Sequence, residues 1–86
     1  MTLKQIVYVS SAQRNLDDTE HAHILASARR NNAKNGLTGM LLTVDRGFLR
    51  LLEGPAEACD ETFQRISADP RHTGVRKLYD APTEKR

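Results

Sequence analysis

The chain has 86 residues, a formal net charge of +2, and thirteen lysines and arginines that are scattered along it rather than clustered. This length predicts a single domain over residues 1–86 with a small core, and so mild a charge does not single out nucleic acid as a partner. Cys59 is the sole cysteine and no apolar run approaches the ~20 residues of a membrane span, so we expect a cytoplasmic protein without disulfides.

The first third of the chain predicts a strand and a helix. Residues 5–10 are β-branched and aromatic, as is typical of a strand. Its side chains alternate between two faces, one carrying Ile6, Tyr8 and Ser10 and the other carrying Val7 and Val9. Residues 15–19 supply capping groups for a helix over residues 20–32, which Asn35-Gly36 ends. One stripe of this helix carries Ile24, Ala28, Asn31 and Asn32.

Two more strands are expected over residues 37–44 and 48–52, joined by a hairpin at residues 45–47. The second of them places side chains on two faces, with Phe48, Arg50 and Leu52 on one and Leu49 and Leu51 on the other.

Gly54-Pro55 is expected to open a second helix with proline at its first position, and Pro70 to end it at Asp69. Its apolar face consists of Cys59, Phe63 and Ile66. Residues 75–79 then predict a last strand, followed by a polar tail over residues 80–86.

The resulting β-α-β-β-α-β order predicts an α+β fold of the ferredoxin-like type, a mostly antiparallel sheet with two helices on one face. The opposite face of the sheet is also apolar, through Val7, Val9, Leu49 and Leu51. An apolar face of this kind is normally covered. We therefore expect a homo-oligomer formed through it, with additional chain beyond residue 86 as the alternative cover.

Four segments carry a more specific signal: IVYVSS over residues 6–11, ARRNNAKNGLTG over 28–39, FLRLLEG over 48–54 and RISADPRH over 65–72. In order and spacing they resemble the BLUF family of blue-light sensors along nearly the whole chain. The resemblance implies a flavin, FAD with FMN as the alternative, held between the two helices. It further implies a sensor rather than an enzyme, one that signals by contact with a separate effector protein.

The resemblance assigns cofactor-binding roles to side chains whose chemistry suits a flavin. Ile24 and Ile66 would clamp the flat ring from opposite sides, because such a ring prefers apolar walls. Asn32 would bind the flavin C4 carbonyl and N3–H with its amide, and Asn31 would be a second contact. The other expected cofactor-binding residues are Ala28, Phe48, Arg65, Asp69, Arg71 and His72. Each assignment has an alternative that needs no flavin. Ile24 and Ile66 could be ordinary core residues, and Asn32 a polar residue near the end of a helix. Arg65 and Asp69 could form an ion pair along a helix.

Tyr8 resembles the tyrosine that donates an electron and a proton to the excited flavin, and its alternative is a core tyrosine. The family's light-switching glutamine is replaced by Arg50. A guanidinium has donors and no acceptor, so it cannot exchange hydrogen bonds as an amide does. We expect a photoactive centre of Tyr8 and Arg50 whose photocycle is lost or altered, in which the cation favours reduced, anionic flavin. Alternatively, Arg50 extends into solvent at the sheet edge.

A second departure is that the family's fifth strand, with its Trp or Met, is missing from these 86 residues. Other functions remain open: a light-insensitive flavin or redox-binding domain, a pure interaction domain, or an RNA-recognition module using Tyr8 and Phe48. The RNA motif breaks at residues 49–51, so nucleic acid is not an expected partner. His21 and His23 lie two residues apart and make a poor metal pair.

Overall fold

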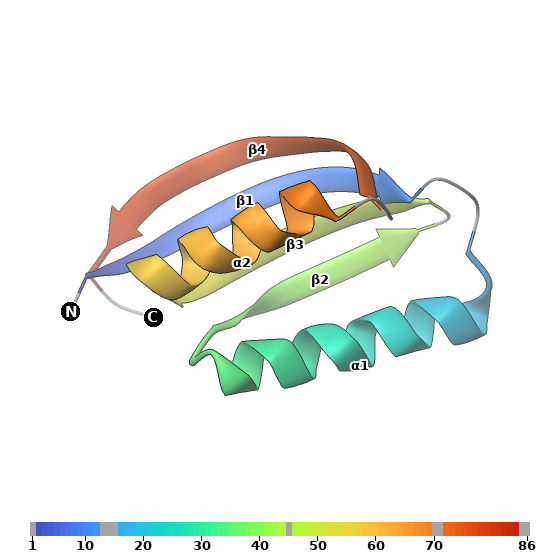
Figure 1. Cartoon of the computed structure of the whole chain (residues 1–86), viewed down its shortest axis with the longest axis horizontal. Coiled ribbons are helices and arrows are strands. Elements are labelled where there is room, and N and C mark those ends of the chain that lie inside the picture. The colour runs from blue at the N-terminus through green and yellow to red at the C-terminus, as the bar shows by residue number, and fades with distance from the viewer. Residues whose placement is uncertain (1, 13–15, 45, 70–71, 85–86) are drawn as a thin grey trace.

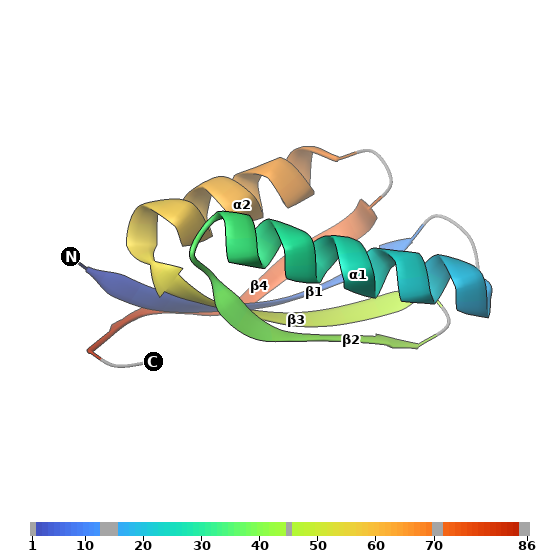
Figure 2. The same cartoon turned by 90° about the horizontal axis from the view of Figure 1, so that it is seen from below.

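The computed structural model describes residues 2–12, 16–44, 46–69 and 72–84, with the side chains of Val44 and His72 left aside. The elements follow in the order β1 (Leu3–Ala12), α1 (Asp18–Lys34), β2 (Thr38–Val44), β3 (Gly47–Pro55), α2 (Ala56–Ala68) and β4 (His72–Thr83). The sheet has the strand order β2-β3-β1-β4, and every neighbouring pair is antiparallel. Both helices lie on one face of it (Figures 1 and 2). The predicted ferredoxin-like fold is confirmed.

The core lies where α2 covers the two central strands. In the register of β1 with β3, Ile6 is opposite Leu52 and Tyr8 is opposite Arg50, and all four side chains are buried beneath the helices. Cys59 of α2 is fully buried against them, and its Sγ faces the carbonyl oxygens of residues 4 and 54. The predicted apolar face of α2 is thereby confirmed. Partly buried side chains complete the cluster: Ala58, Phe63, Ile66 and Val75.

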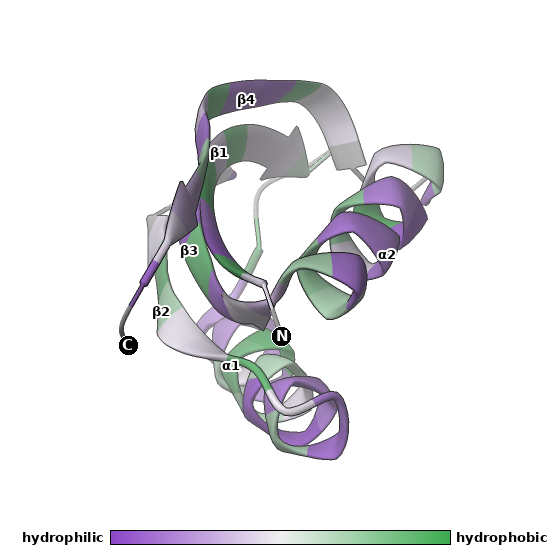
Figure 3. Ribbon diagram, turned by 90° about the vertical axis from the view of Figure 1, so that its left-hand side faces the viewer, coloured by the Kyte–Doolittle hydropathy of each residue, from purple (hydrophilic) through white to green (hydrophobic). Residues whose placement is uncertain are grey.

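The two helices are anchored differently. Helix α2 packs against β1, β3 and β4, whereas within the described residues α1 packs against β2 alone and has no buried residue. Figure 3 shows the curved sheet with α1 beside β2 and α2 beside the other strands. Asp17 begins α1 with a capping box, in which its side chain accepts from the backbone of Glu20. Neither described helix is long and apolar enough to cross a membrane.

Two predicted boundaries were wrong. Pro55 is the last residue of β3 and caps α2, with an extended ψ of 134°, because its backbone pairs with Leu3. Strand β4 extends well beyond residues 75–79, and Asp80 to Thr83 continue it instead of forming a tail. Ladder hydrogen bonds come from the backbone, so an edge strand does not need apolar side chains and tolerates Pro82. The end of α2 before extended Asp69 agrees with the prediction.

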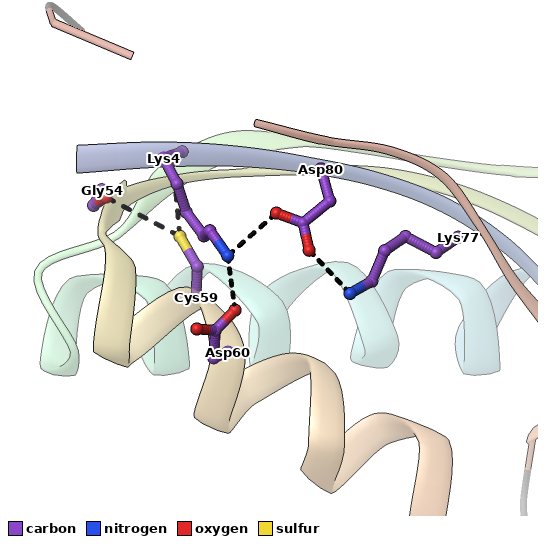
Figure 4. Close-up of polar contacts among 6 residues, drawn as sticks. All are labelled: Lys4, Gly54, Cys59, Asp60, Lys77 and Asp80. Atoms are coloured by element: carbon purple, nitrogen blue, oxygen red, sulfur yellow. Dashed lines mark hydrogen bonds and ion pairs between the residues drawn. The ribbon is translucent and has the colours of Figure 1, made fainter. Parts of the chain in front are cut away.

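A charged network fastens β4 to the rest of the fold (Figure 4). Lys4 Nζ of β1 lies 2.8 Å from an oxygen of Asp60 on α2 and 2.9 Å from one of Asp80 on β4. Lys77 Nζ lies 2.7 Å from the other Asp80 oxygen and 4.6 Å from the centre of the Phe63 ring. Hydrogen bonds from Lys77 and Lys4 lower the pKa of Asp80 below 3.8, and those to Asp60 and Asp80 raise the pKa of Lys4 above 10.5.

These directions predict that stability falls at acidic pH. Because folding lowers the pKa of Asp80, the ionised side chain contributes fully to the free energy of unfolding above about pH 3.8. This contribution is lost as the pH falls through the lower pKa of the folded state. We expect Asp80→Asn to lower the free energy of unfolding by up to about 1 kcal/mol near neutral pH, and by less near pH 3. Urea unfolding at both pH values measures this, with Glu61→Gln as the control for losing one carboxylate. An equal cost of Asp80→Asn at both pH values would contradict the role of the network.

Candidate functional site

A pocket of about 1010 Å³ lies between the two helices and the sheet. Its volume is at the upper end of the ~300–1,000 Å³ typical of small-molecule sites. Ile24 of α1 and Ile66 of α2 stand on its two helical walls, and Phe48 lies on the sheet beneath. Apolar atoms make up most of the pocket surface, and polar side chains, including the charged Glu20, Arg65 and Asp69, contribute the rest. This combination is characteristic of a site for a flat organic ligand.

The structure brings most of the predicted site residues together in this pocket. Those that line it are Tyr8, Ile24, Ala28, Asn31, Phe48, Arg50, Arg65, Ile66 and Asp69. Asn32 is not among the residues that line the pocket, and its side chain contacts Arg50. Arg71 and the side chain of His72 are outside the described residues. Sequence reasoning missed several lining residues, among them Thr19, His23, Ser27, Leu41 and Thr62. Helical spacing from Ile24 and Ile66 could have identified Ser27 and Thr62.

Arg50 is buried at the sheet side of the pocket, with only 8% of its surface exposed. Its Nη2 donates to Asn32 Oδ1 at 2.8 Å, and its Nη1 makes a longer hydrogen bond of 3.5 Å to the Tyr8 hydroxyl. The alternative in which this side chain extends into solvent at the sheet edge is wrong, because β3 lies between β2 and β1. Within the described part of the chain, Arg50 has no ion pair with a carboxylate.

Tyr8 stands beside Arg50 on the neighbouring strand and is 2% exposed. Its ring packs edge-on against Phe63, with 5.3 Å between the ring centres. Burial raises the pKa of Tyr8 above 10.0, although the charge of Arg50 and its hydrogen bond act in the opposite direction. The phenol is therefore neutral near pH 7 and keeps its proton available for donation.

Thr62 provides a test of what the pocket holds. It is 7% exposed and lines the pocket one helical turn before Ile66, yet its Oγ1 is buried without a hydrogen-bond partner among the described residues. A buried polar atom without a partner is rare in folded proteins, and a ligand group can supply the missing bond. Apolar walls, amide groups and an unpartnered hydroxyl together fit a flat ring with a polar edge, and a flavin is such a ligand.

The opposite face of the sheet is unusually apolar. Met40 and Leu42 of β2 are 57% and 53% exposed, and Leu49 and Tyr79 are also exposed. A small hollow of about 120 Å³ lies among Val7, Met40, Leu42, Leu49 and Leu51, beside part of Arg50. The predicted apolar face is thus more extensive than the sequence indicated, because β2 and β4 add Met40, Leu42 and Tyr79 to it.

Comparison with known proteins supports the same interpretation. The family model for BLUF, described as sensors of blue-light using FAD, matches residues 3–86. The photoactivated adenylate cyclase subunit beta of Euglena gracilis is 39% identical over 85 residues, which are 99% of this chain and 10% of that protein. The dark-state structure of BlrB, a BLUF protein, superposes with a TM-score of 0.84 at 36% identity, covering 99% of this chain and 64% of that one. The structure of Klebsiella pneumoniae BlrP1 with FMN and cyclic diGMP superposes with a TM-score of 0.85 at 30% sequence identity, covering 98% of this chain and 23% of that one.

The unpartnered hydroxyl of Thr62 yields a stability prediction. Thr62→Val keeps the shape of the side chain and removes the buried polar atom, so we expect it to raise the free energy of unfolding of the flavin-free protein by about 1 kcal/mol. Thr43→Val is the matched control, because the Thr43 hydroxyl lies 2.6 Å from His21 Nδ1. That variant should lose about 1 kcal/mol. Urea unfolding of both measures the difference, and equal destabilisation would show that the Thr62 hydroxyl is already satisfied.

Proposed function

Because the chain belongs to the BLUF family of flavin-binding blue-light sensors, we propose that it binds FAD in the pocket between α1 and α2 and that Arg50 alters its photocycle. Residues 1–86 form the sensor domain in this proposal. The observation that carries it is the hydrogen-bonded group of Tyr8, Arg50 and Asn32, of which Tyr8 and Arg50 are buried, beside a pocket whose surface is mostly apolar.

Different residues of the pocket are assigned to different parts of the flavin. Ile24 and Ile66 hold the ring between the helices, and Phe48 and Ala28 complete the apolar surface. Asn31, which lines the pocket, offers its amide to the polar edge of the ring. We assign the same role to the amide of Asn32, whose oxygen accepts from Arg50. Arg65 and Asp69, at the end of α2, face the ribityl chain, and Arg71 and His72 are assigned to the chain or its phosphate. FAD is favoured over FMN by the description of the family, although a BlrP1 structure contains FMN.

Light sensing in this family depends on the hydrogen bonds at the edge of the flavin. When bound, the flavin supplies blue-light absorption and accepts an electron. Tyr8 is placed to donate an electron and its phenolic proton, since it is buried and neutral. Arg50 holds the Asn32 oxygen and the Tyr8 hydroxyl, and it only donates. A side chain without an acceptor cannot reverse these bonds, so the usual rearrangement is blocked.

The visible spectrum tests this function. We expect the purified chain incubated with FAD to be yellow, and its dark and illuminated spectra to superimpose. Arg50→Gln restores an amide that both donates and accepts, so that variant should show a red shift under blue light that decays in the dark. Tyr8→Phe in the Arg50→Gln background is the control and should abolish the shift. A reversible red shift of the unaltered chain would show that Arg50 supports the cycle, and a colourless protein would refute flavin binding.

We also propose that the signal passes to a separate effector protein in the cytoplasm, by contact. The named relative is a photoactivated cyclase subunit, and this chain spans 10% of its length. The exposed sheet face supports a homo-oligomer, because Met40, Leu42 and Leu49 present an apolar centre. Glu53 lies opposite Gln5 and Arg76 opposite Val9, so charges of opposite sign stand toward the two ends of this face. A two-fold axis that lies between two packed faces, perpendicular to the line joining these charges, would bring each charge near its opposite.

Disrupting the apolar face should dissociate the oligomer. Leu42 is opposite Leu49 in the register, so Leu42→Lys places a charge at the centre of the exposed face. We expect a dimer by light scattering for the unaltered chain and a monomer for this variant. Ala22→Lys adds the same charge to exposed α1 and should leave the mass unchanged. A monomeric unaltered chain at high concentration would disprove this oligomer.

A further inference from the structure

The buried guanidinium of Arg50 lacks a counter-charge within the described structure. Its two hydrogen-bond partners are the neutral amide of Asn32 and the neutral phenol of Tyr8. The charged network described above, around Lys4 and Asp80, does not include Arg50. A buried cation without a neighbouring anion is unfavourable, and an anion brought next to it is correspondingly stabilised.

The position of Arg50 directs this unsatisfied charge toward the ligand. The side chain lines the pocket, and two of its five N–H groups are used by Asn32 and Tyr8. Apolar atoms make up most of the pocket surface, so a ligand that displaces water from the pocket would leave the charge weakly screened. Glu20 and Asp69 also line this pocket, although neither has an ion pair with Arg50 in the described structure, so a ligand that contacts Arg50 would supply the charge that balances it.

We propose that this pocket distinguishes the redox states of its flavin, binding the reduced anion more tightly than the oxidised form through Arg50. The inference rests on the flavin site proposed above. An oxidised flavin ring is neutral, and two electrons with one proton, equivalent to a hydride from a reduced nicotinamide, convert it to an anion near pH 7. Arg50 can offer the anion a charge-assisted hydrogen bond, which is roughly twice as strong as a neutral one.

Tighter binding of one redox state changes the reduction potential by thermodynamic linkage. If the reduced form binds about tenfold more tightly, the midpoint potential of the bound flavin rises by about 30 mV above that of the free flavin, because the couple transfers two electrons. A domain with this property reports the supply of reductant through the charge of its flavin. Light absorption is then dispensable for switching between two states of the pocket.

The decisive experiment measures FAD binding anaerobically in both redox states, with dithionite to produce the reduced form. For the unaltered chain we expect the dissociation constant of oxidised FAD to exceed that of reduced FAD by about tenfold or more. Equal constants, or tighter binding of oxidised FAD, would overturn the inference while leaving the flavin-binding function intact. Failure to bind FAD in either state would instead refute the flavin-binding function itself.

Variants assign the effect to Arg50. Arg50→Gln should bring the two dissociation constants close together and lower the midpoint potential by about 30 mV, and Arg50→Lys should keep most of the preference because it keeps the charge. Arg29→Gln removes one positive charge from the exposed surface of α1 and should leave the potential unchanged. A potential that responds equally to Arg29→Gln and Arg50→Gln would show that net charge, and not Arg50, is responsible. If Arg50→Gln does not fold, the binding ratio of the unaltered chain still decides the matter.

Discussion

The antiparallel pairing of β1 with β3 is the constraint on which the rest of the molecule depends. This register sets Ile6 opposite Leu52, Tyr8 opposite Arg50 and Ser10 opposite Phe48, all directed toward the helices. Side chains alternate along a strand, so a shift of one residue in this pairing would turn the side chains of one strand to the opposite face and separate the two halves of this set. The hydrophobic core and the polar centre of the pocket are therefore specified by one and the same ladder.

The fold leaves a pocket because its helices are held by different parts of the sheet. Helix α2 is anchored by Cys59 and Phe63 against the central strands, whereas α1 rests on β2. The space between them is bounded by residues from both helices and the sheet. An 86-residue chain buries a modest fraction of its surface, and a ligand that fills such a space stabilises the folded state by mass action.

Arg50 is a buried positive charge at the centre of this arrangement. Burying a guanidinium between neutral groups is unfavourable for the empty protein, yet hydrogen bonds to Asn32 and Tyr8 hold it there. Cores usually avoid such a charge, and violations of local rules concentrate at functional sites. In our proposal the same side chain blocks the amide chemistry of the usual light switch and gives the pocket a preference for an anion, so a single residue would underlie both effects.

The order of the elements, the α+β class and the two-sided apolar character of the sheet followed from the sequence alone. These features are local: alternation marks β1 and β3, capping groups precede α1, and the sequence predicts the end of α2 at Asp69. The resemblance to the BLUF family added the candidate site residues, most of which the fold gathers around one pocket.

Only the tertiary structure decided where Arg50 points, that Thr62 lacks a partner, and that the residues after Tyr79 continue the sheet. Each of these depends on groups that are far apart in the sequence. Arg50 is enclosed because β3 lies between β2 and β1, and Asp80 belongs to the sheet because the backbone of β1 pairs with it at Ile6. Periodicity within one segment records which face a side chain occupies, whereas its solvent access and hydrogen-bond partners are set by the elements that pack upon it.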